Sequence, residues 1–223
     1  MNSLKIVLRL GGSILGSPPE AGVVKAYSKV VSSVLKQKHD VVVVVGGGSV
    51  ARQYINIARE AGLPPEAQDR IAIQVSRLNA RLFGLSLGVD DVATTARAAV
   101  SEVKKHHIAV MGGLKPGITT DTVATLVAEA WHADLILKAS DQKGIYTEDP
   151  RKSPSAKLLP AISYERLVEI LGGEHSPGIH SIVDPVAVRR IAKSRIRLVV
   201  FKGDDPENVL RVINGERVGT TVG

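Results

Sequence analysis

The chain has 223 residues, of which 44% are hydrophobic and 23% charged, a composition typical of a globular protein with a sizeable core. Its length favours one domain over residues 1–223, and no stretch approaches the roughly 18 apolar residues of a membrane span, so we expect a soluble protein without a membrane partner. Cysteine is absent, which excludes disulfides and thiolate metal sites and makes the cytoplasm the default location.

The formal net charge is +7 at pH 7, and the basic residues are scattered rather than gathered in one tract. Phe, Tyr and Trp make up only 3% of the chain, which leaves few aromatic side chains on which bases could stack. We therefore expect no nucleic-acid partner. A basic surface of this kind also attracts phosphorylated metabolites.

Short β-branched apolar runs alternate with longer segments of helical periodicity. In chain order, strands are expected at 4–10, 41–45, 108–111, 135–137 and 197–201. Helices are expected at 20–37, 49–61, 66–87, 120–132, 164–171, 184–193 and 206–213, and functional or mobile loops at 139–161 and 172–183. The strand runs are apolar at successive positions, which predicts an α/β fold with a mainly parallel sheet between helix layers.

Three of the expected strands end in glycine: Gly11-Gly12 follows the first, Gly46-Gly47-Gly48 the second, and Gly112-Gly113 the third. The carboxyl ends of parallel strands meet at one edge of a sheet, where helices begin with unpaired N–H groups that attract anions. Neither the dinucleotide motif G-x-G-x-x-G nor the P-loop motif follows any strand. The turns predict a phosphate site on another scaffold, with plain strand-to-helix turns as the alternative.

The blocks VLRLGGS (7–13) and VVVGGGS (43–49) resemble the amino acid kinase superfamily. Within it, the blocks GGGSVAR (46–52), SRLNA (76–80), MGGLKPGITTD (111–121) and GIYTEDPR (144–151), together with Asp184-Pro185, are similar to uridylate kinases of archaeal type. The resemblance spans nearly the whole chain. It implies a three-layer αβα sandwich, a homohexamer, and transfer of the γ-phosphoryl group of ATP to UMP, which yields UDP and ADP in pyrimidine nucleotide biosynthesis.

The resemblance also implies roles for individual residues. It assigns ATP binding to Arg9, Leu10, Gly11, Gly12, Ser13, Gly48, Arg52, Ser140, Asp141, Tyr146 and Asp149. It assigns UMP binding to Gly47, Asp69, Leu114, Lys115, Pro116, Gly117, Ile118, Thr119 and Thr120. Catalytic roles fall to Arg9, Arg52 and Asp121, with Asp121 orienting the cations. The implied Mg²⁺ is carried by ATP, and no metal site of the protein's own is expected.

Several of these assignments have structural alternatives. Arg9 stands where many members of the superfamily have lysine, and it could instead pair with a nearby carboxylate. Asp69 could be an exposed charge in the first turn of a helix, and Tyr146 could serve loop packing. Lys138 and Lys143 are candidates for a further catalytic cation only because they lie close to the ATP loop.

Other members of the superfamily are competing interpretations. Isopentenyl phosphate kinases need a histidine shortly after the triple glycine, and residues 49–52 (SVAR) contain none. Acetylglutamate and carbamate kinases stay possible at the level of the fold, although neither accounts for the SRLNA and PGITTD blocks. A nucleotide sensor or storage protein without activity is the remaining alternative, and the retention of Arg9, Arg52 and Asp121 argues against it.

Overall fold

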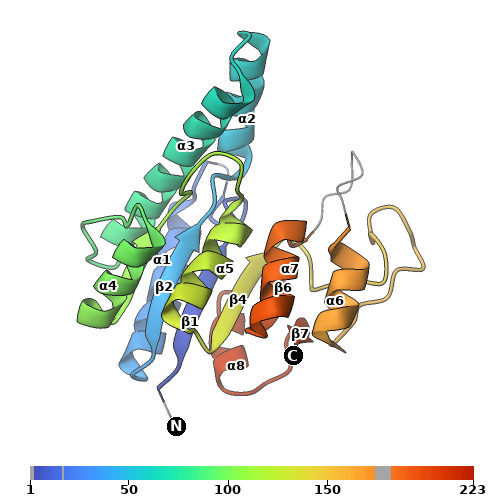
Figure 1. The fold of residues 1–223 in the computed structure, drawn as a ribbon. Helices are drawn as coiled ribbons and strands as arrows, with labels where there is room; N and C mark the ends of the chain where they lie inside the picture. Colours follow the sequence, from blue (N-terminus) through green and yellow to red (C-terminus); the bar gives the residue numbers. More distant parts are fainter. Residues whose placement is uncertain (1–2, 17, 174–181) are drawn as a thin grey trace.

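In the residues that the computed structural model describes (3–16, 18–173 and 182–223), the chain forms one seven-stranded sheet in the order β3-β2-β1-β4-β6-β7-β5 (Figure 1). The strands are β1 (Lys5–Leu10), β2 (Asp40–Val45), β3 (Ile108–Met111), β4 (Leu135–Ser140), β5 (Ala161–Ile162), β6 (Arg197–Lys202) and β7 (Thr220–Val222). The helices are α1 (Ala21–Lys36), α2 (Gly48–Glu60), α3 (Pro65–Leu85), α4 (Ala96–His106), α5 (Thr120–Trp131), α6 (Tyr164–Leu171), α7 (Pro185–Ser194) and α8 (Asn208–Ile213). No helix in these residues is long and apolar enough to cross a membrane.

The strands from β3 to β6 along the sheet pair in parallel, and β7 runs antiparallel to β6. The chain builds the sheet outward from β1 in one direction through β2 and β3, and in the other direction through β4 and β6. The reversal lies between β1 and β4, and ligands of such sheets bind outside the carboxyl ends of the strands at this point. Arg9 of β1 and Lys138 of β4 are direct neighbours in the register.

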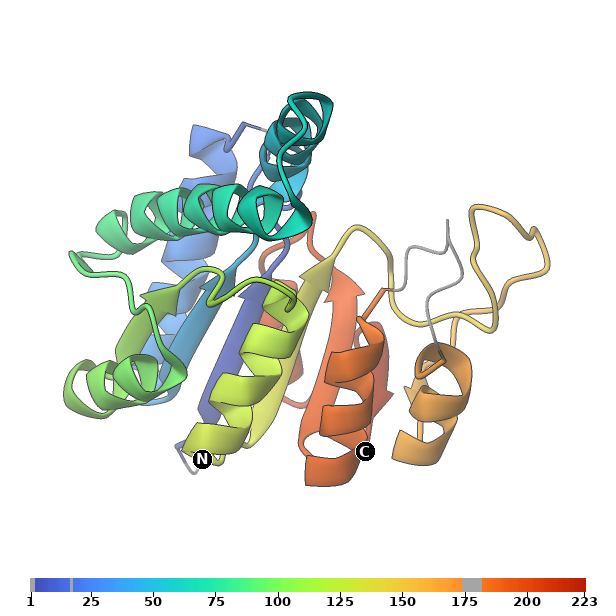
Figure 2. The same ribbon diagram turned by 45° about the horizontal axis from the view of Figure 1, so that its top comes forward.

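Apolar side chains fill the space on both faces of the sheet, as the uninterrupted apolar strands predict. In β2, Val42 and Val44 pack into one core, while Val41, Val43 and Val45 pack into the other. The first core is covered by α4, α5, α6 and α7, and the second by α1, α8 and the end of α3 (Figure 2). The three-layer αβα sandwich and its mainly parallel sheet are therefore confirmed.

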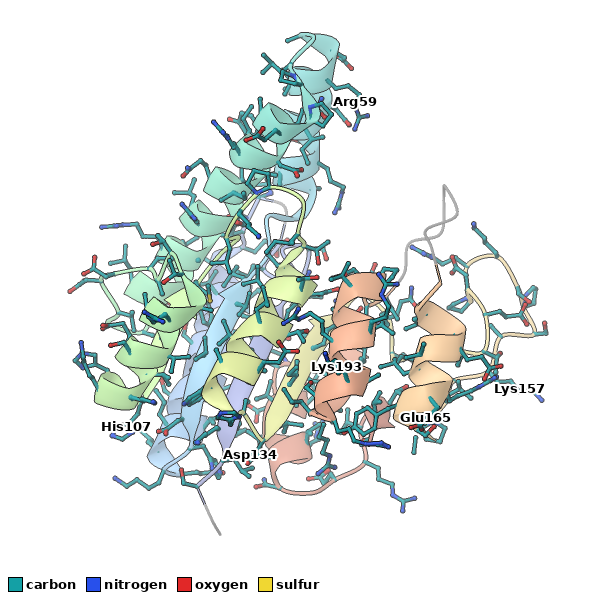
Figure 3. The ribbon with its side chains drawn as sticks, in the orientation of Figure 1. Arg59, His107, Asp134, Lys157, Glu165 and Lys193 are labelled. Atoms are coloured by element: carbon teal, nitrogen blue, oxygen red, sulfur yellow. The ribbon has the colours of Figure 1, made fainter. Side chains whose placement is uncertain are left out.

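Helices α2 and α3 form an antiparallel pair that projects past the carboxyl edge of the sheet (Figure 1). Arg59, near the end of α2, lies toward the tip of this pair (Figure 3). The Gly46-Gly47-Gly48 turn leads from β2 directly into α2. Helices α2 and α3 therefore form one side of any binding site at the carboxyl edge of the sheet.

The seven expected helices are all present in the described part of the chain, with ends that shift by at most two residues. Helix α4 is an addition: its buried face consists only of Ala99, Val100 and Val103, too small a stripe to give a clear periodicity. Strands β5 and β7 were not predicted either, because segments of two or three residues are too short to form a recognisable apolar run. Of the expected loop 172–183, residues 174–181 lie outside the described residues.

Thr220 of β7 fastens the last strand to the long loop after β4. Its fully buried Oγ1 accepts a hydrogen bond from Ile145 N at 2.8 Å and donates one to Leu159 O at 2.5 Å. This hydroxyl group joins both ends of the loop to the C-terminal strand, beside the hydrogen bond from Thr221 N to Pro160 O at 3.0 Å.

We expect Thr220→Val to lower the free energy of unfolding by about 1–3 kcal/mol, because the isosteric side chain leaves a buried N–H and C=O unpaired. Denaturant unfolding would measure the change. The control is Thr221→Val, at a partly exposed neighbouring position on the other face of β7. Equal stabilities of the two variants would contradict the role given to Thr220.

Candidate active site

The glycine turns after β1, β2 and β3 lie at the carboxyl edge of the sheet, away from the edge that His107 and Asp134 mark in Figure 3. The first two turns touch: a Cβ atom on Gly12 would lie 2.0 Å from the backbone nitrogen of Gly48. Gly48 itself has φ of +66°, a conformation that favours glycine. These turns therefore need glycine for contact between backbones, apart from any ligand.

Three adjoining cavities open at this edge. The central cavity, of about 560 Å³, is lined by Arg9, Gly11, Ser13, Arg52, Thr119, Asp121, Lys138, Ser140, Asp141, Gln142, Arg151, Ile182 and Asp184. The loop cavity, of about 390 Å³, is lined mainly by residues 145–153, and it shares Gln142 and Ile182 with the central cavity. The hairpin cavity, of about 140 Å³, lies between α2, α3 and residues 113–120, and it shares Thr119 with the central cavity.

An ion cluster forms the floor of the central cavity. Arg9 and Lys138 stand side by side on β1 and β4, and Asp121, in the first turn of α5, contacts both. Arg9 Nε lies 2.7 Å from Asp121 Oδ1, and Lys138 Nζ pairs with the same oxygen. The side chains of Arg9, Asp121 and Lys138 are 16%, 10% and 7% exposed. Without the carboxylate, two like charges would be buried together, at a cost of several kcal/mol for each unpaired ion.

The environment of the cluster changes the pKa values of its members. Burial, and next the like charge of Arg9, lowers the pKa of Lys138 to about 8. Burial alone would raise the pKa of Asp121, but Arg9 and Lys138 together bring it below its ordinary value. Asp121 therefore stays ionised near neutral pH, while Lys138 loses its proton far more readily than an exposed lysine.

Arg9 also has contacts outside the cluster. Its Nη2 donates to Thr120 Oγ1 at 2.9 Å, and a Cβ atom on Gly11 would lie 2.9 Å from Nη1. Its Nε is close to Asp121 but is not aligned for a hydrogen bond, and no described residue accepts from it. The sequence left open whether Arg9 pairs with a carboxylate, and the structure shows this pair with Asp121. The same guanidinium lines the central cavity, and its buried Nε donor has no hydrogen-bond acceptor among the described residues.

Asp184 ties two helix starts together beside the central cavity. Its Oδ1 accepts from Val186 N at 2.9 Å and Ala187 N at 3.0 Å, which caps α7. The same carboxylate accepts hydrogen bonds from the hydroxyl groups of Thr119 and Thr122. Thr119 is the N-cap of α5, so Asp184 holds the start of α5 in place.

The expected ATP and catalytic residues fall in two of the cavities. The central cavity gathers Arg9, Gly11, Ser13, Arg52, Asp121, Ser140 and Asp141, and the loop cavity gathers Tyr146 and Asp149. Gly12 and Gly48 lie in the contact between the first two turns and line none of the three cavities. The side chain of Leu10 lies in the core, so only its backbone could approach a ligand.

Most of the expected UMP residues gather in the hairpin cavity. These are Gly47, Asp69, Lys115, Ile118, Thr119 and Thr120. Leu114, Pro116 and Gly117 belong to the same loop but do not line it. The Gly117 N–H donates to Asp69 Oδ2 at 2.8 Å, so the carboxylate also shapes the loop and is more than an exposed helix charge.

Sequence reasoning placed Arg151 and Asp184 in matching blocks but gave them no role in the site, and it placed Lys138 only by proximity. A lysine inside the otherwise buried strand LILKAS was the available signal for Lys138, because a buried charge needs a partner. Arg151 binds Asp149 through Nε and Nη2, both at 3.0 Å, and reaches the central cavity from the long loop. The two hydroxyl partners of Asp184, Thr119 and Thr122, lie 65 and 62 residues away from it in the sequence.

Four cations line the central cavity: Arg9, Arg52, Lys138 and Arg151. The start of α2 adds the positive end of a helix dipole, with Gly47 at the N-cap and no side-chain cap. Such an arrangement favours a polyphosphate and can stabilise the charge on a phosphoryl group during transfer.

We expect the affinity of the central cavity for the MgATP that the sequence resemblance implies to fall as the pH rises through about 8, by about tenfold at most per pH unit for one proton. The charge of Lys138 is present below this pKa and lost above it, and the groups that face it are Arg9, Asp121 and Asp184. Calorimetric titration between pH 7 and 9.5 would measure the effect.

The control is Lys138→Arg, which stays charged over this range and should bind with a flat pH profile. Thermal unfolding at each pH separates weaker binding from loss of structure. An unchanged slope in the variant, or a flat profile in the wild type, would remove Lys138 from the phosphate site.

Known proteins resemble this chain over nearly its whole length. Residues 5–202 match the model of the amino acid kinase family. The uridylate kinase of Methanothermobacter thermautotrophicus is 40% identical over 223 residues, which cover 98% of this chain and 99% of the relative. That of Natronomonas pharaonis is 37% identical over 223 residues, with 98% of each chain covered.

A crystal structure of the uridylate kinase from Archaeoglobus fulgidus is similar throughout, with a TM-score of 0.91 at 36% identity. The match covers 99% of this chain and 100% of the other. Sequence blocks, fold and site geometry thus agree: the chain belongs to the amino acid kinase family, and within it to the uridylate kinases of archaeal type.

Proposed function

We propose that this protein is an ATP-dependent UMP kinase, which transfers the γ-phosphoryl group of ATP to UMP and releases UDP and ADP. The observation that carries the proposal is the row of three cavities, in which a cationic centre lies between two smaller spaces. Two nucleotides bound end to end would place their phosphates in the centre and their nucleosides at either side. The product supplies pyrimidine nucleotide biosynthesis.

ATP occupies the loop cavity and the central cavity in this proposal. Its nucleoside lies against Tyr146 and Ile145, with Asp149 held in place by Arg151. Its phosphates meet the side chain of Ser13 and the backbone of Gly11, where the absence of a Cβ atom permits a close approach. The backbone of Leu10, Gly12 and Gly48 lies next to these residues in the two touching turns. Ser140 and Asp141 stand between the two spaces at the end of β4.

UMP occupies the hairpin cavity, with its phosphate toward Gly47 and the start of α5. Asp69 offers a carboxylate to the ribose hydroxyls, and the loop 114–120 encloses the nucleoside. Thr119 lines both the hairpin cavity and the central cavity, so its position marks the meeting point of the two substrates.

In this reaction the protein mainly aligns the two substrates and neutralises the negative charge of their phosphates. A phosphate monoester has a second pKa of about 6, so the attacking oxygen of UMP is already anionic at pH 7 and needs no general base. Arg52 and Lys138 would balance the charge of the transferred group. The guanidinium of Arg9, which lines the same cavity, would add a further positive charge. Asp121 acts through Arg9 and Lys138 and is the positioning residue of both.

The Mg²⁺ that accompanies ATP would be held by the phosphates rather than by the protein. Asp121 and Asp184 are the carboxylates deepest in the central cavity, and both are already engaged, by two cations and by two helix starts. This donor set fits an ion that keeps its own water and phosphate ligands. When bound, the ion supplies further neutralisation of phosphate charge.

The proposal extends to assembly and domain structure. On α3, Leu78, Leu82 and Leu85 are 67%, 46% and 51% exposed at a spacing that places them on one face of the helix. Exposed Tyr54 and Ile57 lie on the neighbouring helix α2. An apolar face of this kind marks an interface, and we propose that further copies cover it in a homohexamer located in the cytoplasm.

Residues 1–223 form one domain in this proposal, with the acceptor side in its N-terminal part and the ATP side in its C-terminal part.

Purified protein with MgATP should form ADP with UMP and markedly less with CMP, acetylglutamate, carbamate or isopentenyl phosphate. A coupled ADP assay would measure this, with UDP identified by chromatography. Arg52→Ala is the control for contaminating kinases, because removal of a phosphate-directed cation should lower kcat by about 100-fold or more. Absence of UDP in the wild type, or full activity in the variant, would refute the proposed reaction or the role of Arg52.

Replacement of Leu78 and Leu82 by glutamate should dissociate the wild-type hexamer into smaller species, because charges would be buried in the contact. Light scattering after gel filtration would give the masses. Leu158→Glu, at an exposed leucine on the long loop, is the matched control and should stay assembled. A monomeric wild type, or a hexameric double variant, would show that this face does not hold the assembly.

A further inference from the structure

The middle of α3 holds two of the glycine turns through three neighbouring side chains. Ser76 Oγ accepts from Gly113 N at 2.8 Å. Arg77 donates from Nε to Gly113 O at 3.0 Å and from Nη2 to Leu114 O at 3.1 Å. Asn79 Nδ2 donates to Gly46 O at 3.0 Å, in the turn that leads into α2. One turn of helix thus binds the ends of both β2 and β3.

Neither Arg77 nor Asn79 lines any of the three cavities, so a direct contact with substrate does not explain them. Both act on backbone carbonyl groups that are 32 to 37 residues away in the chain. Asn79 is 5% exposed, and a buried amide without its acceptor would be costly. The guanidinium of Arg77 reaches two successive carbonyls from two separate nitrogens in a fixed plane, a geometry that the single nitrogen of an ammonium group does not reproduce.

The backbone of α3 also approaches the second of these turns closely. A Cβ atom on Gly112 would lie 2.7 Å from Arg77 N. The turn after β3 can therefore rest directly on the helix, and the fork of Arg77 holds the next two residues of the loop. Gly113 and Leu114 are the point from which the loop 114–120 departs toward the hairpin cavity.

We propose that Arg77 and Asn79 are positioning residues of the acceptor site: Arg77 sets the loop that encloses the acceptor nucleotide, and Asn79 sets the turn at its phosphate. This inference rests on the proposed UMP kinase reaction. It assigns a selective effect to Arg77, because its contacts reach the acceptor loop and none of them reaches the lining of the loop cavity. Loss of Asn79 should affect both substrates, since Gly46 precedes the turn between them.

The test compares Arg77→Gln with Arg81→Gln, which removes the same charge one turn further along α3 at an exposed position. We expect Arg77→Gln to raise KM for UMP about tenfold or more, because small misplacements of a binding loop are costly, and to leave KM for ATP within about twofold. Arg77→Lys should recover only part of the loss. Equal changes of both KM values, or the same effect in Arg81→Gln, would overturn the role of Arg77.

Hydrogen exchange without substrates gives an independent readout. Amides of residues 113–120 should exchange faster in Arg77→Gln than in the wild type, while those of β4 stay unchanged. Asn79→Asp, which keeps the shape but removes the donor, should raise both KM values. If the wild type makes no UDP but residues 113–120 exchange faster in Arg77→Gln, the proposed reaction is wrong and the role of Arg77 in holding the loop is retained. If UDP forms and Arg77→Gln changes neither the exchange nor KM for UMP, the inference is wrong.

Discussion

The site depends on the contact of one carboxylate with two cations. Arg9 and Lys138 are neighbours on parallel strands, and their positive charges would repel each other in a buried position. Asp121 compensates for this repulsion from the start of α5, so that β1, β4 and α5 meet at one oxygen atom. The cluster keeps a surplus of one positive charge beside the cavity. It thus binds the elements together and attracts phosphate at the same place.

The sequence predicted well what is local. The apolar runs and glycine turns located five strands, seven helices and the edge at which the site lies, and the fold class is confirmed. The motifs also assigned Arg9, Arg52 and Asp121 to one site, and all three side chains line the central cavity. In each case the informative residues lie next to one another in the chain.

What the sequence could not predict depends on pairs that are far apart. The partnership of Lys138 with Arg9 requires knowledge that β4 lies beside β1, which periodicity does not contain. Asp184 reaches Thr119 across 65 residues, and Arg77 reaches Leu114 across 37. Helix α4 was missed for another reason, because a stripe of small side chains buries too little apolar surface to stand out.

The contact between Gly12 and Gly48 limits how this protein can vary. A larger side chain elsewhere in a core can be accommodated when a neighbouring side chain becomes smaller. At Gly12 the neighbouring atoms are backbone, so no replacement of a partner residue can make room. A larger residue at Gly12 therefore cannot be compensated by a second substitution in the other turn. New acceptor specificities in this fold have to arise in the helices and loops around the two turns.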